Sequence, residues 1–433
     1  MTLAESVPAK EAATLDGLPS AELTMRDADR LAECGAFGEA ARLYEKLYDR
    51  WPGDQIAIRI AFCYWCLGDA DSACAALNRA THVPSDLHRT GLALADLLFA
   101  KGDTAQAIEF YRTAASCQRL SAQHHVNLEY LYREIGDLAN AARQTEWQLL
   151  RNHRNPAYYE RGMLLPRWDG GPLGGRSLLI HCADGFGDSL QHVRFVRHAL
   201  ADCARVTLDC PPALVRLFKV SFAGATIVSD RSALTDVHDT HACVLALSGF
   251  PALSRRPIPK PPYLFAESGS VGRRAHGPRR IGLCWRASDY SRMRCFPLEA
   301  AHPLRALGDI INLQKDVTPQ EVLHLKVIGP LGRTTEPIND FLDVANLLAT
   351  LDGLITVDTA VAHLAGAMNV PTVVVVCQPY APFWRHRSIA RTYYPSIALL
   401  CKPKGQPWGS FFANNIGRIE RLLGTLRKLV SLG

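Results

Sequence analysis

A repeat of glycine and alanine at regular intervals is the feature that most restricts how the first third of this chain can fold. Glycines recur at nearly equal spacing, and an alanine follows each of them at the same short interval. The four pairs are Gly35 and Ala40, Gly68 and Ala73, Gly102 and Ala107, and Gly136 and Ala141. Glycine fits the tight turn between two antiparallel helices, and alanine lets the second helix approach the first. The repeat therefore predicts a stack of helix pairs.

A period of about 34 residues with small residues at these places is typical of tetratricopeptide (TPR) repeats. We expect about four such repeats, an α-solenoid over residues 26–152, after a flexible terminus at residues 1–25. Such an array usually presents a concave surface to a peptide or a partner protein. The alternative is a helical support that only stabilises or dimerises the rest of the chain. Cys63-Tyr-Trp-Cys66 lies in this helical pattern with no second pair at zinc spacing, which favours packing over metal binding.

Beyond a connector at residues 153–175, rich in glycine and proline, the pattern changes to alternating strands and helices. Apolar runs predict a first set of strands at residues 177–182, 205–209, 225–228 and 242–247. A second set is predicted at residues 280–285, 310–313, 354–357 and 371–377, after stretches rich in proline, glycine and arginine. Two successive α/β halves, residues 176–270 and 271–433, predict two Rossmann-like domains that face each other across a cleft.

The segment from Leu351 to Ala367 carries the strongest functional signal. An apolar strand ends at Asp358-Thr359, a helix of small residues follows, and a second apolar strand completes a βαβ unit. A parallel sheet binds ligands at the carboxyl ends of its strands, where the N–H groups of a helix start favour an anion such as a diphosphate. The pattern predicts a nucleotide site, with a plain βαβ crossover and a capped helix as the alternative.

Composition narrows the class of protein. The 433 residues carry a net charge of +6 with no long basic run, which suits a small anionic ligand and does not call for nucleic acid. The start lacks a signal-peptide pattern, and the longest apolar runs are too short to cross a bilayer. The 13 cysteines are scattered and often lie beside apolar residues, as expected for reduced thiols in a cytoplasmic protein.

Together, the motifs after residue 165 resemble bacterial glycosyltransferases of the GT-B fold that carry a TPR array in front. This group is related to heptosyltransferases and, more distantly, to O-linked N-acetylglucosamine transferase. The matching segments include Gly185-Phe-Gly-Asp188, Gly282-Leu-Cys-Trp285, Arg294-Cys-Phe-Pro-Leu298, Leu313-Gln-Lys315 and the stretch from Val357 to Gly366. The resemblance implies an N-terminal TPR α-solenoid followed by a transferase of two Rossmann-like domains.

The resemblance also implies which positions of the second half bind the nucleotide sugar. These positions are Arg294, Gln314, Lys315, Asp358, Thr359, Ala360 and His363. The family normally has a glycine where this chain has Ala287, after Trp285-Arg286. Arg286 is an unusual charge at a strand end and could add a phosphate contact. Helix N–H groups and cationic side chains can stabilise a leaving diphosphate without a metal, so no metal and no cofactor other than the sugar donor is expected. The alternatives are that Asp358 only caps the helix and that His363 only packs.

The glycine-rich turn of the first half would serve the acceptor. By resemblance, Asp188 would act as the general base on an acceptor hydroxyl, and Asp184, Gly185 and Gly187 would form the loop around it. The family usually has Glu-Gln where this chain reads Ala183-Asp184. Asp184 could replace that glutamate, or acceptor choice could have changed. Asp188 could instead serve as a cap for the helix that follows.

These features and the resemblance predict a cytoplasmic, bacterial glycosyltransferase that moves a sugar from a nucleotide-diphosphate donor to an acceptor hydroxyl without a metal. The resemblance implies inversion of configuration. The TPR array suggests a protein acceptor. Two other hypotheses stay open. The chain could be a TPR adaptor whose GT-B part is inactive, which the Ala183-Asp184 departure favours, or a transferase that acts on a lipid or saccharide precursor.

Overall fold

The structure of the chain, a computed structural model, describes residues 25–432 apart from internal gaps. The gaps are at 68, 78, 81–91, 93–94, 97, 100–102, 118–119, 121, 136, 138–139, 142–143, 145–164, 167, 183–184, 231–237, 251–255, 268–276, 288–294, 329–337, 378–381, 386 and 404. Asp184 and Arg294 therefore lie outside the described residues, as do nearly all of the predicted flexible terminus and three of the four repeat glycines.

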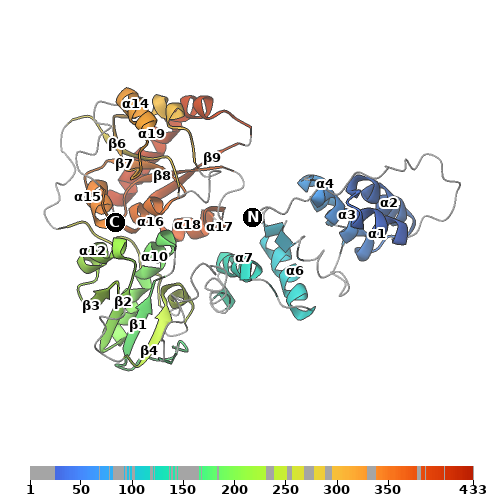
Figure 1. Cartoon of the computed structure of the whole chain (residues 1–433), viewed down its shortest axis with the longest axis horizontal. Coiled ribbons are helices and arrows are strands. Elements are labelled where there is room, and N and C mark those ends of the chain that lie inside the picture. Colours follow the sequence, from blue (N-terminus) through green and yellow to red (C-terminus); the bar gives the residue numbers. More distant parts are fainter. Residues whose placement is uncertain are drawn as a thin grey trace. The chain divides into compact units, whose positions relative to one another are not determined.

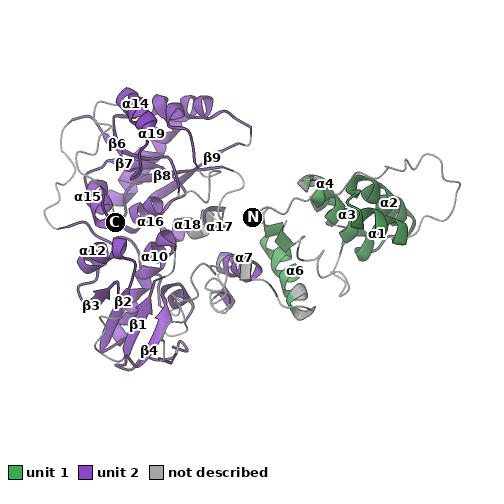
Figure 2. Cartoon of the chain, in the orientation of Figure 1, with its two compact units in different colours: residues 1–119 green, residues 120–433 purple. Residues whose placement is uncertain are grey.

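The chain divides into two compact units, residues 1–119 and residues 120–433 (Figure 2). The described helices of the first unit are α1 (Met25–Glu33), α2 (Phe37–Arg50), α3 (Asp54–Cys66), α4 (Ala70–Leu77) and α6 (Thr104–Cys117). Helices α1 to α4 pack against one another in succession. The second unit begins near α7 (Ala122–Glu134), which the sequence places in the fourth repeat. The predicted array over residues 26–152 is thus shared between the two units.

Equivalent positions of the sequence repeat have the same burial and the same capping hydrogen bonds in the structure. The four repeat alanines, Ala40, Ala73, Ala107 and Ala141, are all fully buried. The aspartate of each Gly-Asp pair accepts a hydrogen bond from the backbone N–H three residues later, as in an N-cap. The three pairs are Asp69 with Ser72, Asp103 with Gln106, and Asp137 with Asn140. Helices and turns therefore recur where the spacing predicts them, while the assignment of these helices to the TPR class stays a prediction.

The first half of the second unit is built on a four-stranded parallel sheet of order β3-β2-β1-β4 (Figure 1). Its elements are β1 (Ser177–His181), α10 (Phe186–His192), η3 (Val193–Phe195), α11 (Val196–Asp202), β2 (Arg205–Asp209), α12 (Pro212–Ser221), β3 (Ala225–Val228), β4 (Thr240–Cys243) and η5 (Val244–Gly249). The predicted strand over residues 242–247 is wrong in its second part, which is a 3₁₀ helix. Val244 to Leu247 are buried there, and an apolar run alone cannot distinguish a buried strand from a buried helical turn.

The second half is built on a five-stranded parallel sheet of order β6-β5-β7-β8-β9. Its strands are β5 (Arg280–Cys284), β6 (Asp309–Asn312), β7 (Gly353–Val357), β8 (Thr372–Cys377) and β9 (Ile397–Lys402). Its helices are η7 (Leu298–Leu307), α14 (Pro319–Ile328), α15 (Phe341–Ala349), α16 (Ala360–Ala367), α17 (Pro382–Arg385), α18 (Arg387–Tyr393) and α19 (Trp408–Leu432). The two predicted α/β halves are therefore present, each with its own parallel sheet.

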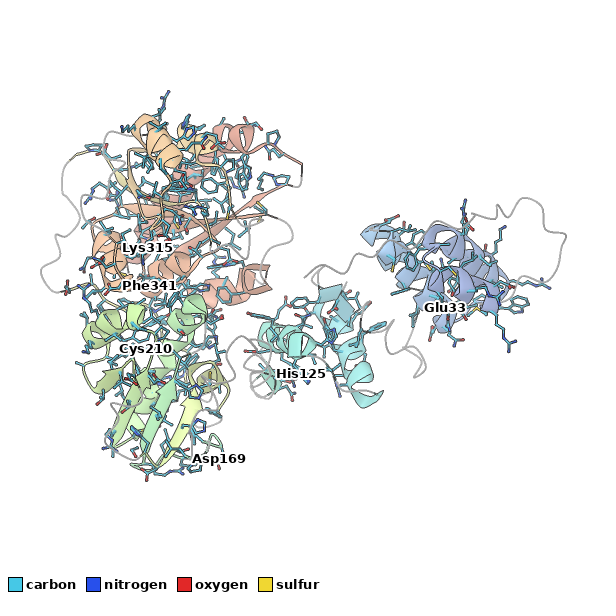
Figure 3. All side chains as sticks on the ribbon, in the orientation of Figure 1. Glu33, His125, Asp169, Cys210, Lys315 and Phe341 are labelled. Carbon is cyan, nitrogen blue, oxygen red and sulfur yellow. The ribbon has the colours of Figure 1, made fainter. Side chains whose placement is uncertain are left out.

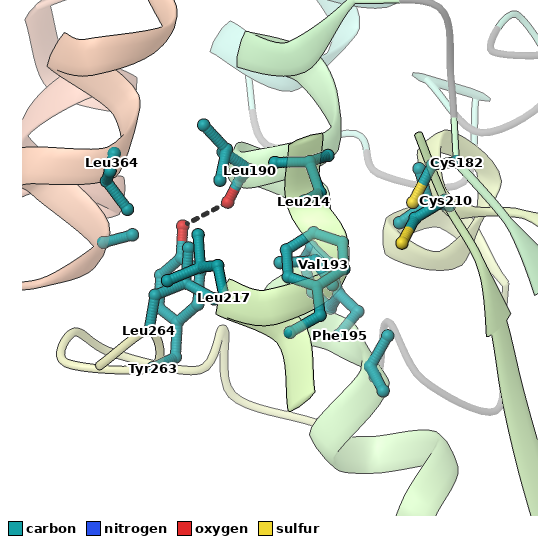
Figure 4. Close-up of a cluster of buried hydrophobic side chains, with 14 of the residues drawn as sticks. Cys182, Leu190, Val193, Phe195, Cys210, Leu214, Leu217, Tyr263, Leu264 and Leu364 are labelled. Atoms are coloured by element: carbon teal, nitrogen blue, oxygen red, sulfur yellow. Dashed lines mark hydrogen bonds between the residues drawn. The ribbon is translucent and has the colours of Figure 1, made fainter. Parts of the chain in front are cut away.

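The two halves share one hydrophobic core. The buried cluster that includes Leu190 of α10 also includes Leu364 of α16. Figure 4 shows both side chains beside Tyr263, whose hydroxyl points to the Leu190 carbonyl. On the exposed side of the same junction, the Arg216 guanidinium of α12 lies 3.0 Å from carboxylates on the second half, those of Asp340 and Asp343. No helix within the described ranges is long and apolar enough to span a membrane.

Candidate functional site

The starts of α10 and α16 touch each other, and this contact brings the two predicted halves of the site together. Each helix follows the carboxyl end of a central strand, β1 in the first sheet and β7 in the second. A Cβ atom added at Gly187 would lie 3.0 Å from His363 Cδ2, 3.6 Å from His363 Nε2 and 3.8 Å from Ala360 Cα. Gly187 thus has no side chain at a close contact between α10 and α16, and a larger residue would push them apart.

The first turn of α16 has no capping bond from its own N-cap side chain. Thr359 occupies the N-cap position without a side-chain capping bond, and its Oγ1 instead lies 3.3 Å from Thr356 Oγ1. In α15, by contrast, the Asp340 carboxylate accepts hydrogen bonds from two backbone N–H groups of the first turn. N–H groups at a helix start that no side chain fills are suited to bind a phosphate oxygen.

Asp358 directly precedes the N-cap residue of α16. Its side chain is buried, with 6% of its surface exposed, and its Oδ1 accepts a hydrogen bond of 2.6 Å from Trp384 Nε1. A buried carboxylate needs such donors because desolvation of an unpaired charge is costly. Trp384 is fully buried in α17, so it both packs in the core and donates to the Asp358 carboxylate.

His363 lies in an aromatic cluster on the same helix. Its ring has centroid distances of 5.4 Å to Phe383, 5.2 Å to Trp384 and 5.7 Å to Tyr394. Its Nδ1 lies 3.2 Å from the Tyr394 hydroxyl oxygen, and the opposite edge of the ring lies beside Gly187. Gly366 makes room for this cluster, since a Cβ there would be 2.5 Å from Tyr394 Cδ1. The packing interpretation and the site interpretation of His363 are therefore both compatible with its surroundings.

Asp188 lies in the first turn of α10. Its carboxylate turns back over Gly185, where an added Cβ would meet Asp188 Oδ2 at 2.7 Å. Gly185 is the N-cap of α10 and provides no side-chain capping bond. Asp188 is half-buried and belongs to the turn whose Gly187 contacts α16. The structure therefore brings Asp188, Gly185 and Gly187 of the first half near Ala360 and His363 of the second half.

The predicted donor-side residues at the ends of β5 and β6 have other partners. Gln314 Oε1 accepts a hydrogen bond of 3.0 Å from the backbone N–H of Arg286, which links the two strand ends. The Arg286 guanidinium donates to the Asp316 carbonyl and forms an ion pair of 3.2 Å with Glu321. Lys315, labelled in Figure 3, is exposed on the loop after β6. Gln314 and Arg286 thus support the strand ends.

The electrostatic surroundings of Glu321, near the ends of β5 and β6, agree with a structural role for this residue. Burial opposes ionisation of its carboxyl group, but hydrogen bonds from Thr318 and Trp285 and the charge of Arg286 outweigh burial and lower its pKa. Burial raises the pKa of the nearby Cys284 thiol, which is a neutral neighbour of Gln314. No group of three or more potential metal ligands occurs among the described residues.

The sequence interpretation missed a second group of residues behind the site, namely Arg194 and Tyr263. Arg194 is fully buried in η3 and contacts both Tyr263 and the backbone of Tyr393. A charged residue within an apolar helical pattern normally faces solvent. Arg194 has contact partners 69 and 199 residues away in the chain, so no local pattern predicts its burial.

No protein-family model matches the chain, and no curated protein sequence matches it. Among solved structures, it is similar to ADP-heptose lipopolysaccharide heptosyltransferase II of E. coli, at 12% identity over 58% of this chain and 99% of that one, with a TM-score of 0.41. An O-GlcNAc transferase of Thermobaculum terrenum shares 13% identity over 94% of this chain and 92% of that one, with a TM-score of 0.31. MamA shares 18% identity over 30% of this chain and 76% of its own, with a TM-score of 0.25. At these values the similarities do not assign a function.

Proposed function

We propose that the chain transfers a glycosyl group from a nucleoside-diphosphate sugar to an acceptor hydroxyl. The observation that carries this proposal is the contact between the starts of α10 and α16, each at the carboxyl edge of its own parallel sheet. A transferase of this kind has to hold a diphosphate on one side and an acceptor hydroxyl on the other. The start of α16 would bind the anion, and the start of α10 places the Asp188 carboxylate beside it.

The donor diphosphate would bind at the first turn of α16. The N-cap residue Thr359 makes no side-chain capping bond to this turn, and the helix dipole favours negative charge there. Asp358 is held in place by Trp384, so it would shape the site and orient the turn. Arg294 and Lys315 would add positive charge around the leaving diphosphate, as the family resemblance implies. Such groups stabilise the charge that develops on the leaving group without requiring a metal.

The acceptor would approach from the α10 side. In the proposed reaction, the acceptor oxygen forms a bond to the anomeric carbon of the sugar while the bond from that carbon to the diphosphate oxygen breaks. The acceptor proton passes to the Asp188 carboxylate, and the electron pair of the broken bond leaves with the nucleoside diphosphate. A carboxylate within hydrogen-bond reach is a suitable base for this step. Attack from the face opposite the leaving group would invert the configuration.

We also propose that the acceptor is a protein bound through the helix pairs of residues 26–152. The support is the regular recurrence of buried alanines and capped helix starts, which resembles a TPR solenoid. The side chains of Trp51 and Leu67 are 53% and 52% exposed in the first unit, and in this proposal they contact the bound acceptor. A double change to serine at these positions should raise the KM for a protein acceptor without changing the affinity for the donor.

The test of the proposed function is the thermal stability of the full chain with UDP, ADP, GDP and CDP and with a sugar ester of each. A ligand that binds only the folded state stabilises it by about 2.7 kcal/mol at one hundred times its Kd. We expect one base to raise Tm, and Thr359→Val or Asp358→Ala to reduce the shift. Glu420→Gln is the matched control, since this carboxylate is exposed on α19 and pairs only with the exposed Arg279 in the described residues.

Transfer itself would be followed with the sugar ester of the base that binds, by release of the free nucleoside diphosphate with and without acceptor. Asp188→Asn should bind the donor with nearly unchanged affinity and lose at least about a hundredfold in transfer rate. If no nucleotide of the panel raises Tm, the adaptor hypothesis is favoured and the donor site proposed at α16 is wrong.

A further inference from the structure

Helix α7, the last helix of the repeat pattern that the structure describes, packs on the α/β part of the second unit. It contacts α17 and α18, two short helices that follow each other between β8 and β9 (Figure 1). Tyr130 of α7 is half-buried and packs against the hydrophobic cluster that the two halves share. That cluster includes, from α17 and α18, the side chains of Phe383, Trp384, Ala390 and Tyr393. The repeat pattern therefore meets the α/β part at this pair of helices.

The same two helices also reach the candidate site and the first half. In α17, the Trp384 indole N–H donates the 2.6 Å hydrogen bond to Asp358, which directly precedes the N-cap residue of α16. In α18, the Tyr393 carbonyl accepts a hydrogen bond of 3.2 Å from the buried Arg194 of the first half. Helices α17 and α18 thus connect three parts of the second unit, namely α7, the first half and the start of α16.

The position of α17 depends on what packs against it. A helix of four residues is too short to be stable by itself, so its place is fixed by neighbours such as α18 and α7. A ring removed from this packing would leave a cavity, and the surrounding residues would shift to fill part of it. A hydrogen bond weakens when its donor moves or turns, because it needs a short distance and a nearly straight angle. The bond from Trp384 to Asp358 is therefore sensitive to the packing of α7.

We propose that Tyr130 is a positioning residue for the donor site and that it acts through α17. Its ring holds α17 where Trp384 can donate to Asp358, and Asp358 in turn orients the first turn of α16. The helix that ends the described repeat pattern is thereby part of the support of the donor site. The effect on α17 depends only on the packing, whereas the effect on a bound nucleotide rests on the proposed function.

The packing is tested without any ligand, by hydrogen exchange and mass spectrometry of the full chain. We expect Tyr130→Ala to speed exchange in peptides that cover α17, α18 and the start of α16. Tyr130→Phe should keep the wild-type rates there, because the ring remains. Tyr132→Ala is the matched control, since two residues turn a helix by about 200° and Tyr132 therefore faces away from Tyr130. Wild-type exchange in Tyr130→Ala, or the same increase in Tyr132→Ala, overturns the proposal.

Donor binding is measured by calorimetric titration with the nucleoside diphosphate that raises Tm, at a temperature where every variant is folded. We expect Tyr130→Ala to weaken binding about fivefold, as for the loss of one hydrogen bond, and Tyr132→Ala to leave it unchanged. Unchanged binding in Tyr130→Ala contradicts the positioning role.

A double variant tests whether Tyr130 acts through Trp384. Trp384→Phe lacks the indole N–H, so adding Tyr130→Ala to it should weaken donor binding no further, because both changes remove the same bond. If the two effects multiply instead, Tyr130 acts by another route and the proposal is wrong. If hydrogen exchange changes as expected in a chain that binds no nucleotide, the contact through α17 stands and only the proposed function fails.

Discussion

Replacement of Gly187 by alanine tests whether the contact between α10 and α16 is the site. The added Cβ would lie 3.0 Å from His363 Cδ2, which is closer than the 3.4 Å at which ordinary van der Waals contact begins. The two helix starts would therefore have to separate by a few tenths of an ångström. Overpacking of this kind costs about 1–3 kcal/mol, and the better helix propensity of alanine returns about 0.5–1 kcal/mol. We expect a net loss of stability of about 1 kcal/mol.

The effect on transfer should be larger than this small loss of stability suggests. A misplacement of about 1 Å at a reacting centre costs about a hundredfold in rate. A displacement of about 0.4 Å then corresponds to roughly sixfold, if the logarithm of the rate scales with distance. Urea unfolding and the rate of nucleoside diphosphate release, measured on the same preparation, separate the two effects.

Gly424→Ala is the matched control for this experiment. It makes the same chemical change in helix α19, where an added Cβ meets nothing within 4 Å. We expect it to raise stability by up to about 1 kcal/mol without changing the rate. A Gly187→Ala variant that folds and transfers sugar at the wild-type rate would show that the contact between α10 and α16 lies outside the reacting centre.

Three further predictions concern other parts of the chain. Trp384→Phe removes the indole N–H that donates to the buried Asp358 carboxylate, and should lower the unfolding free energy by about 1–3 kcal/mol in urea titrations and weaken donor binding. Ala73→Leu should overpack α4 by about 1–3 kcal/mol, whereas Ala75→Leu at an exposed position of the same helix should be nearly neutral by the same measurement. Burial raises the pKa of the Cys210 thiol to about 12, so the unfolded chain loses this proton first as the pH rises. The contribution of the protonated thiol to the free energy of unfolding is fully present below the pKa of the unfolded chain and is lost between about pH 9 and 12. Cys210→Ala should therefore flatten the loss of stability at alkaline pH.

The strands of the two α/β halves were predicted well from the sequence, because each strand is marked by a local apolar pattern. Strands β2 and β3 match their predicted bounds, and β7 and β8 begin or end within a residue of theirs. The helical stretch after β1 is divided into α10, η3 and α11. At that break lies Arg194, whose partners are far away in the chain. Its burial depends on the packing of two sheets against each other, which no window of sequence contains.

The site was predictable in its position but less so in its interactions. The carboxyl ends of parallel strands fix where Thr359 and Asp188 lie, so the βαβ pattern and the glycine-rich turn were sufficient to locate them. They were not sufficient to show that Asp358 is bonded to Trp384 or that Arg286 is paired with Glu321. These contacts join elements separated by variable loops, and the same motif could be supported by other partners.

The hydrogen bonds between the repeat helices differ from copy to copy. The hydroxyl of Tyr44 is hydrogen-bonded to Asp29, and that of Tyr111 is hydrogen-bonded to Asp96, each pair 15 residues apart. The equivalent positions of the copy between them are Phe62 and Leu77, which are both apolar. The fourth copy has Tyr130 and Thr145 at these positions, so no carboxylate is present there. An engineered array that keeps the first and third copies would keep both hydroxyl–carboxylate bonds, whereas one built from the second copy would lose them.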